Sequence, residues 1–579
     1  MIARSPGLTC ALRTGLALGC VALLGCTSDP PAEETSGGSS QSGGSAPGGS
    51  GGVSGGGGSS GSASGGLSSA GASASGGSTS SGGMAGAPVQ ATEPPFDWVG
   101  IIGTGQSLSN GADSVAISTT QPFNNLMLRD DGPDPKYPID GSESAVWSVV
   151  PLTEPHRPNI THSMDNYPYP NNILGKGELF GETPHSGMAN TISTAWVARN
   201  PGGDYVTVHS VVGMGGQCLI GLEKAAGATS YEPALSEARV FQKLASAQGK
   251  SYGVGGIVLT HGECDTSTGT ADYGERVVKL WQDYNTDLRA ITGQDRDIVL
   301  LASQQSAVTT SDAEAYDTPA VQLWRASHEH PDQVIVTEAK YAYGPYWLHM
   351  PAPSYERVGE KYGEVFDLVF NQAVVWKPVG PKAVSRSGTL ITVELDVPNP
   401  PLVWDDDLAR PHQSKHTAWA NGRGFEVKDQ QGNELSIANV EISGESVLVT
   451  LNSDPAGPVV LGYALTADAD PGSWGGTDLG PHGQLRDSDS FEGYAAEAID
   501  VLLTNGSNQV SASEGAFLRR AWLDIVSGTG LAEDTKLLSF NSDSSITLSK
   551  PWSGASGTAP LKFHHNHYNY AVHFAWQVE

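Results

Sequence analysis

Short apolar runs alternate with amphipathic stretches between residues 98 and 370. The runs are rich in Val, Ile and Leu and predict buried strands at Val99–Gly103, Tyr205–Val212, Gly255–Thr260, Ile298–Ala302 and Val334–Thr337. The stretches between them carry apolar residues at helical spacing and predict helices at Met188–Arg199, Ala234–Ala247, Tyr273–Ile291, Thr318–His328 and Ser354–Phe370. This alternation predicts an α/β domain, residues 92–373, with a parallel, doubly wound sheet.

One long stretch, Gln121–His185, departs from this alternation. It is rich in Pro, Asn and Tyr, and its length and polarity predict an insertion that lines a binding cleft. Thr183-Pro184 near its end is typical of a helix start. Capping of this helix start is the default role of the motif that ends at His185, and the alternative is that His185 faces the cleft as a substrate-binding residue.

From Lys377 the pattern changes to strict alternation of apolar and polar residues, as in Thr389–Leu395 and Val447–Leu451. This predicts an antiparallel β-sandwich that ends near Ala464, within a β-rich region covering residues 374–579. The last stretch, Gly472–Glu579, either completes this β-region or returns to pack on the α/β layer.

The first 26 residues have the pattern of an export signal. Arg4 and Arg13 precede an apolar stretch, Leu16–Leu24, that is too short to span a membrane as a mature helix. The sequence Leu-Leu-Gly-Cys that ends at Cys26 resembles a bacterial lipobox, so we expect a lipid on this cysteine. Thr27 follows it, which is similar to lipoproteins sent to the outer membrane. An ordinary signal peptide is the alternative.

Residues 27–91 are almost wholly Gly, Ser and Ala, a composition that predicts a flexible tether. The whole chain has a formal net charge of −30. Phosphate binding needs clustered Lys and Arg, so nucleic acid and anionic lipid surfaces are poor partners. We therefore expect contact with a membrane only through the N-terminal lipid.

Three loops that follow predicted strands carry unusual residues. They are Gly105-Gln106-Ser107, Gly213-Met214-Gly215-Gly216-Gln217-Cys218 and His261-Gly262-Glu263-Cys264-Asp265. The carboxyl ends of parallel strands meet at one edge of the sheet, so we expect these loops to converge. His349, which precedes the last predicted helix, is placed to accept a proton from Ser107. This combination predicts a serine esterase.

Together these loops and the late histidine resemble the SGNH hydrolase superfamily, over about Trp98–Phe370. Within it they are similar to sialate O-acetylesterases and family-six carbohydrate acetylesterases. The resemblance implies a three-layer, flavodoxin-like domain and hydrolysis of acetyl esters on a carbohydrate, with no metal or organic cofactor. It also implies roles for individual residues. Ser107 is the nucleophile and His349 the base, and the oxyanion and substrate-binding groups are Gln106, Gly215, Gly216, Gln217, His261 and the loop around Glu263.

One residue of the family's motif is absent from this sequence. The family's last block is Asp-x-x-His, and here Tyr346 stands where the aspartate is expected. Three alternatives follow. A backbone carbonyl orients His349 in a Ser–His dyad, Glu263 or Asp265 supplies the carboxylate, or the protein is catalytically dead. We favour a dyad or a variant triad.

Cys218 and Cys264 are the only cysteines after Cys26. An oxidising compartment favours their pairing. If the resemblance holds, their loops are neighbours, and we predict a disulfide that joins them; two buried thiols are the alternative. The run His564-His565-Asn566-His567 lacks partners at metal-ligand spacing, so we assign no metal.

The sequence thus predicts an exported, lipid-anchored esterase of the bacterial cell envelope that removes acetyl groups from a sugar or polysaccharide. Two alternatives stay open. One is a surface carbohydrate-binding protein without activity, and the other is a serine esterase that acts on esters other than those of sugars.

Overall fold

The structure is a computed structural model that describes residues 93–130, 147–156, 180–226, 230–306, 315–343, 348–468, 480–491 and 497–579. Residues 88–579 form one compact unit, separate from residues 1–87. The predicted signal with Cys26 and the whole of the predicted tether lie outside the described residues.

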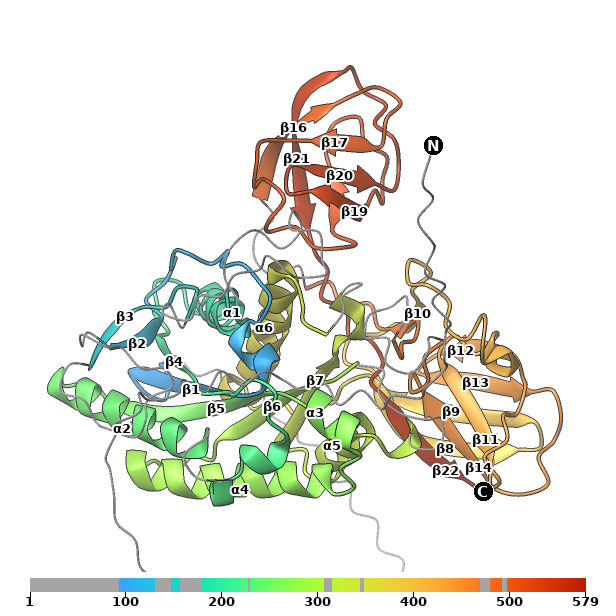
Figure 1. Cartoon of the computed structure of the whole chain (residues 1–579), viewed down its shortest axis with the longest axis horizontal. Coiled ribbons are helices and arrows are strands. Elements are labelled where there is room, and N and C mark those ends of the chain that lie inside the picture. Colours follow the sequence, from blue (N-terminus) through green and yellow to red (C-terminus); the bar gives the residue numbers. More distant parts are fainter. Residues whose placement is uncertain are drawn as a thin grey trace, which may run out of the picture. The chain divides into compact units, whose positions relative to one another are not determined.

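A seven-stranded sheet forms the centre of the α/β part (Figure 1). Its order is β3-β2-β4-β1-β5-β6-β7, and all neighbours are parallel except β2 and β3. The strands are β1 (Trp98–Gly105), β2 (Leu126–Asp130), β3 (Trp147–Pro151), β4 (Thr207–Val211), β5 (Tyr252–Thr260), β6 (Val299–Gln304) and β7 (Val334–Ala339). β1 lies between β4 and β5, where the strand order reverses along the sheet. Ligands bind at such reversals in doubly wound folds.

Helices cover both faces of this sheet. They are α1 (Pro184–Arg199), α2 (Tyr231–Ala247), the short α3 (Glu263–Thr268), α4 (Tyr273–Thr292), α5 (Pro319–Glu329) and α6 (Ala352–Phe366). Val99 and Ile101 share a buried cluster with residues of α1 and α6, whereas Ile102 belongs to the cluster that includes α2, α4 and α5. Successive residues of a strand point to opposite faces, so β1 contributes to both cores.

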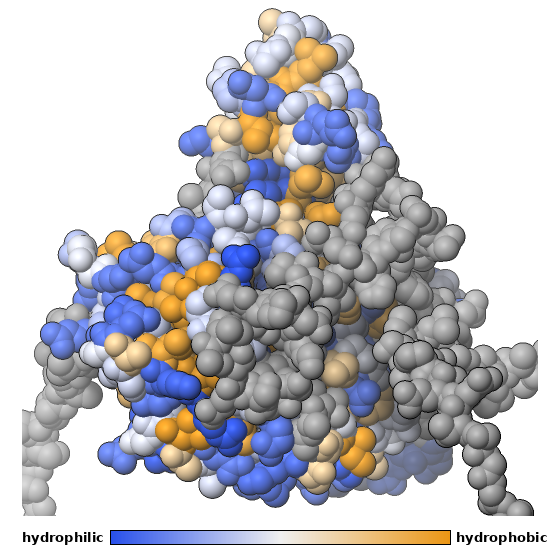
Figure 2. All heavy atoms as spheres, turned by 60° about the vertical axis from the view of Figure 1, so that its left-hand side comes forward, coloured by the Kyte–Doolittle hydropathy of each residue, from blue (hydrophilic) through white to orange (hydrophobic). Residues whose placement is uncertain are grey.

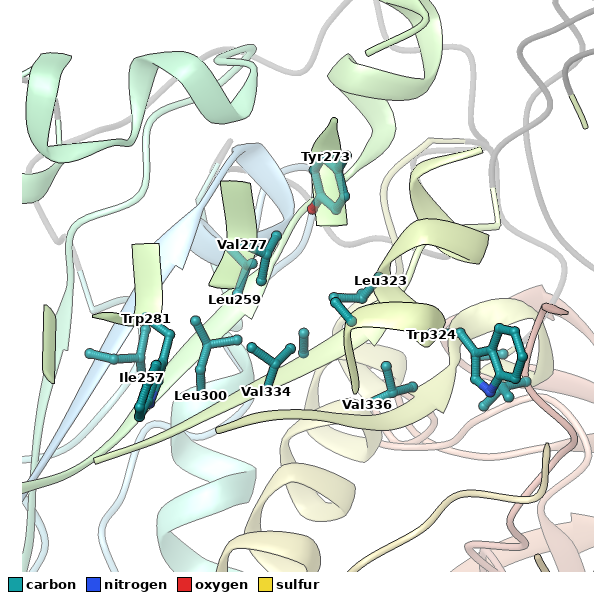
Figure 3. Close-up of a cluster of buried hydrophobic side chains, with 14 of the residues drawn as sticks. Ile257, Leu259, Tyr273, Val277, Trp281, Leu300, Leu323, Trp324, Val334 and Val336 are labelled. Atoms are coloured by element: carbon teal, nitrogen blue, oxygen red, sulfur yellow. The ribbon is translucent and has the colours of Figure 1, made fainter. Parts of the chain in front are cut away.

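Figure 3 shows part of the second core, in which side chains of α4 and α5 meet residues of the parallel strands. Val277, Leu323, Leu300 and Val334 are all buried there. The five predicted strands and five predicted helices of this part are confirmed within a few residues. The α/β prediction rests on these continuous apolar runs. A strand that is apolar throughout is buried on both faces of its sheet, and an α/β fold provides this burial by placing helices on both faces.

The predicted insertion contains a pair of strands that were not predicted, because the stretch is polar overall. β2 and β3 form an antiparallel pair at one edge of the sheet, joined to the rest through β4. Residues 131–146 and 157–179 lie outside the described part, so the predicted cleft lining stays a prediction.

The β-rich region contains three larger antiparallel sheets. One has the order β12-β13-β9-β8, a second β11-β14-β22 and a third β18-β21-β16-β17-β20-β19. The third sheet has a hydrophobic cluster of its own, which includes Val501, Phe517, Ile546 and Leu561. Its strands are β16 (Glu497–Leu503), β17 (Gln509–Ser511), β18 (Ile525–Ser527), β19 (Leu537–Ser542), β20 (Ser545–Leu548) and β21 (Gly557–His564).

The first two sheets share one core. They are built from β8 (Gly380–Ser387), β9 (Leu390–Asp396), β11 (Phe425–Asp429), β12 (Ile437–Ser443), β13 (Ser446–Leu451), β14 (Val459–Tyr463) and β22 (Phe574–Val578), and the short strands β10 (Val403–Trp404) and β15 (Leu485–Arg486) pair beside them. The final strand, β22, pairs with β14 and so completes this region.

The segment before β22 also bonds to the α/β layer. Gln304 at the end of β6 exchanges two hydrogen bonds with the backbone of His573, each 2.9 Å long. The Tyr341 hydroxyl donates to the Ala571 carbonyl at 2.7 Å. The last stretch of the chain therefore both completes the β-region and packs on the α/β layer, the two possibilities that the sequence left open.

Burial on α6 extends well beyond its apolar stripe. Glu356, Arg357, Glu360 and Lys361 are all buried, although their spacing makes them one polar face. The Glu360 carboxylate pairs with His567 Nε2 at 2.5 Å, and Lys361 Nζ donates to the His567 carbonyl at 2.8 Å. The polar face of α6 therefore packs against the C-terminal region and is not solvated.

On the face drawn in Figure 2, hydrophilic and hydrophobic residues are interspersed. In the described ranges, no helix has both the length and the apolar character needed to cross a bilayer.

Candidate active site

The turn that follows β1 places Ser107 at the edge of the sheet. Gly105 has a φ of 135°, and a side chain there would start 2.3 Å from the Thr260 carbonyl oxygen of β5. Only glycine fits this combination of conformation and close approach. Ser107 follows as the first residue of a short 3₁₀ helix, Ser107–Asn110, and is half-buried.

Ser107 is hydrogen-bonded to the histidine that the sequence singled out. The distance from its Oγ to His349 Nε2 is 2.7 Å. The other ring nitrogen, Nδ1, is hydrogen-bonded to Oδ2 of Asp113. A proton on Nδ1 donates to this carboxylate and leaves Nε2 free to accept the serine proton. The three side chains form a Ser–His–Asp chain of contacts.

Asp113 therefore occupies the position that the sequence left vacant. It is 2% exposed, and it lies six residues after Ser107, far from the Tyr346 position where an acid was sought. Tyr346 itself lies outside the described residues. Among the described residues, neither a backbone carbonyl nor Glu263 or Asp265 is hydrogen-bonded to His349 Nδ1, which Asp113 holds instead. The dyad with a backbone carbonyl and the triad through Glu263 or Asp265 are therefore both wrong for the orienting group.

Glu263 has a different role, as part of a buried network beneath the nucleophile. One carboxylate oxygen accepts from Gln106 Nε2 at 2.9 Å, and the other accepts from Lys340 Nζ at 2.6 Å. The Gln106 amide oxygen accepts from the backbone of Cys264 at 3.2 Å. A buried charge is stable only when it is paired and hydrogen-bonded, as Glu263 is here. Glu263 and Gln106 thus hold the Ser107 turn to α3, and sequence reasoning missed Lys340.

Asp265 and His261 also brace loops. Asp265 accepts hydrogen bonds from the Leu219 amide and the Thr270 hydroxyl, both at 2.8 Å. His261 is 1% exposed; its Nε2 donates to the Gln217 carbonyl at 2.9 Å, and its pKa is lowered by burial. Both expected roles are corrected: Asp265 bonds to the Leu219 and Thr270 loops and is not the acid at His349, and both ring nitrogens of His261 are taken up by the Gln217 carbonyl and the Tyr273 hydroxyl.

Gly215 borders the nucleophile. The Cβ of a side chain placed at Gly215 would lie 4.0 Å from the Ser107 Cβ. Gly215 is exposed. The next residue, Gly216, has a φ of 70°, in the left-handed region. Among the described residues, the amides of Ser107, Gly215 and Gly216 have no hydrogen-bond acceptor. Such amides next to a nucleophile are suited to binding a developing oxyanion.

The loops that follow β4 and β5 are linked covalently. Cys218 and Cys264 form a disulfide that spans 46 residues of sequence. It connects the loop of Gly215 to α3, which bonds to Gln106. The disulfide is therefore placed to keep the loop of Gly215 in register with the turn of Ser107.

Loss of this disulfide should destabilise the protein. A closed loop of this length restricts the unfolded chain by an amount worth about 4 kcal/mol in the chain-entropy account. We expect the double variant Cys218→Ser/Cys264→Ser to lose about that much free energy of unfolding in urea titrations. Wild-type protein kept in reductant should match it, and an unchanged midpoint in both would contradict the role of the bridge.

His185 lies in the core, not in a cleft. It is 1% exposed, and its Nδ1 is 2.8 Å from Nδ1 of His209, with His156 also nearby. A side chain at Gly103 of β1 would start 2.0 Å from His185 Nε2. The predicted substrate-binding role of His185 is therefore wrong. A polar residue at a helix start suggested exposure, but helix α1 presents it to the sheet.

Burial lowers the pKa of His185 to about 3. The unfolded chain binds a proton on this residue below its usual value of 6.5, whereas the folded chain does not. Between those values acid therefore favours unfolding, by about 1.4 kcal/mol per pH unit for one such group. We expect the free energy of unfolding to fall less steeply from pH 6.5 to pH 4 in His185→Asn than in wild type. Identical slopes would contradict the neutral, buried state of His185.

Comparisons with known proteins give a fold likeness at low similarity. No protein-family model matches the sequence, and no curated protein matches it. A carbohydrate acetylesterase from Xanthomonas citri shares 13% identity at a TM-score of 0.40, over 67% of this chain and 79% of its own.

An Arabidopsis thaliana protein shares 12% identity at a TM-score of 0.31, over 48% of this chain and 100% of its own. The protein NanS has the same identity and TM-score, over 47% of this chain and 97% of its own. At these values the likenesses assign neither a family nor an activity to this chain.

Proposed function

We propose that this protein is a serine esterase in which Ser107, His349 and Asp113 form the catalytic triad. The observation that carries this proposal is the chain of hydrogen bonds from Ser107 Oγ through both ring nitrogens of His349 to the buried carboxylate of Asp113. A serine hydroxyl is a weak nucleophile unless a base takes its proton, and a neutral imidazole held by a carboxylate is such a base.

The reaction follows from this geometry. Ser107 Oγ attacks the ester carbonyl while His349 Nε2 takes the hydroxyl proton, and Asp113 stabilises the imidazolium that forms. The carbonyl oxygen gains a negative charge, which the amides of Ser107 and the Gly215 loop are placed to bind. The proton on Nε2 passes to the leaving alcohol, and an acyl-enzyme forms. Water then repeats the sequence, which releases the acid and restores the serine.

The finer part of the proposal comes from the sequence resemblance. The ester is the acetyl ester of a sugar or polysaccharide, and the α/β part is an SGNH-type hydrolase domain. The protein is exported and held at the cell envelope by a lipid on Cys26, with residues 27–91 as a tether. The complete set of triad contacts argues against the binding-protein alternative, which was based on a missing acid.

Acetate release tests this proposal. The purified protein would be incubated with acetylated xylan, with O-acetylated sialoglycans and with 4-nitrophenyl esters of two to eight carbons, beside Ser107→Ala. We expect acetate from at least one glycan and a preference for acetyl over longer acyl groups. Equal or better hydrolysis of the longer esters, with no acetate from glycans, would favour the esterase that acts on other esters.

A further inference from the structure

The loop that carries Asp113 has a backbone conformation that needs outside support. Asp113 has a φ of 60°, in the left-handed region that a residue with a side chain enters only at an energetic cost. Such a conformation persists only when the surroundings hold it. The position of the acid therefore depends on the contacts of the loop from Gly111 to Ser118, called here the acid loop.

Two elements of the α/β part hold the acid loop. The Glu182 carboxylate accepts the amides of Ile117 and Ser118, both at 2.9 Å. The Tyr355 hydroxyl of α6 donates to the Ala112 carbonyl at 2.9 Å, directly before Asp113. These contacts fix both ends of the loop.

A third contact comes from the C-terminal region, about 400 residues further along the chain. Arg519 donates through one guanidinium nitrogen to the Ile117 carbonyl at 3.0 Å. Its other terminal nitrogen donates to the Glu356 carboxylate at 2.5 Å, and Glu356 is 5% exposed. Glu356 lies in α6, seven residues after His349. One guanidinium thus bridges the acid loop and the helix that follows the base.

We propose that Arg519 is a positioning residue for the triad, which sets the acid loop relative to α6 and thereby Asp113 relative to His349. This inference rests on the proposed esterase function. It gives the C-terminal β-region a part in catalysis that requires no substrate contact. The planar fork of Arg suits this bridge because it directs two donors to two separate acceptors.

The test compares Arg519→Ala with Arg519→Lys and with a matched control, Arg325→Ala. Arg325 lies on α5 and makes an ion pair with Asp317, which precedes that helix. The Arg325 side chain is 43% exposed, against 36% for Arg519. For each full-length variant, kcat and KM for 4-nitrophenyl acetate and the melting temperature would be measured.

We expect Arg519→Ala to lower kcat about tenfold, since misplacement of a catalytic group by an ångström costs up to about 100-fold. KM should stay within about twofold, so that the loss falls on kcat. Arg519→Lys should recover part of kcat, whereas Arg325→Ala should match wild type.

The outcomes separate the two claims. A kcat of Arg519→Ala equal to that of Arg325→Ala overturns the positioning role and leaves the esterase untouched. If Arg519→Ala does not fold, a folded Arg519→Lys with an unchanged kcat overturns it equally. A wild-type protein that hydrolyses no ester overturns the proposed function and this inference with it.

Discussion

Replacement of Ser107 by alanine should abolish ester hydrolysis, lowering kcat/KM by about 10⁵-fold. Without Oγ there is no atom to attack the carbonyl, and only substrate binding and oxyanion stabilisation remain. The measurement is the steady-state rate with 4-nitrophenyl acetate, at protein concentrations high enough to detect the residual activity.

A matched control separates chemistry from folding. Ser267 is an exposed serine near the end of α3, and its hydroxyl donates to the Cys264 carbonyl at 2.7 Å. Ser267→Ala should keep activity within about twofold. If Ser107→Ala retains more than a hundredth of the wild-type rate while folded, another residue is the nucleophile.

Asp113→Asn should have the second largest effect, a loss of about 10³- to 10⁴-fold in kcat. This loss is smaller than that of Ser107→Ala, and its cause differs. An amide N–H facing His349 Nδ1 makes that nitrogen an acceptor and places the ring proton on Nε2. Nε2 then cannot take the proton of Ser107, although all three side chains stay in place.

Asp272→Asn is the control for this substitution. Asp272 is a half-exposed carboxylate that pairs with Arg276 at 2.9 Å on the surface of α4. It should leave kcat unchanged, and the double variant Ser107→Ala/Asp113→Asn should be no slower than Ser107→Ala alone, because triad members act as a unit. Full activity in Asp113→Asn would show that a different group orients His349.

The sequence allowed prediction of the α/β part because its signals are local. Buried parallel strands are continuous apolar runs, and their helices repeat apolar residues at a fixed spacing. The same spacing shows that α6 has a polar face but does not predict that this face is buried. Burial of Glu356 and Lys361 depends on residues more than 150 positions away, and helical periodicity contains no information about them.

Ser107 and His349 could be found because each lies in a distinctive local setting, a glycine turn and a helix start. Asp113 could not, because its role depends on a left-handed backbone and on burial. One weak signal existed, a single acidic residue between small and apolar neighbours shortly after the nucleophile. The predicted roles of His185 and His261 are wrong because those predictions used local sequence alone. A histidine near a predicted site looks reactive, but both are buried and neutralised by their surroundings.

The most direct test of the central claim is covalent labelling of the nucleophile with an alkyl fluorophosphonate, followed by peptide mass spectrometry. The serine oxygen displaces fluoride, so only an activated serine reacts quickly. The triad predicts one adduct, on Ser107, that forms rapidly in wild type, about 10³-fold more slowly in Asp113→Asn and not at all in Ser107→Ala. An adduct on another residue, or equal labelling rates in wild type and Asp113→Asn, would contradict the triad.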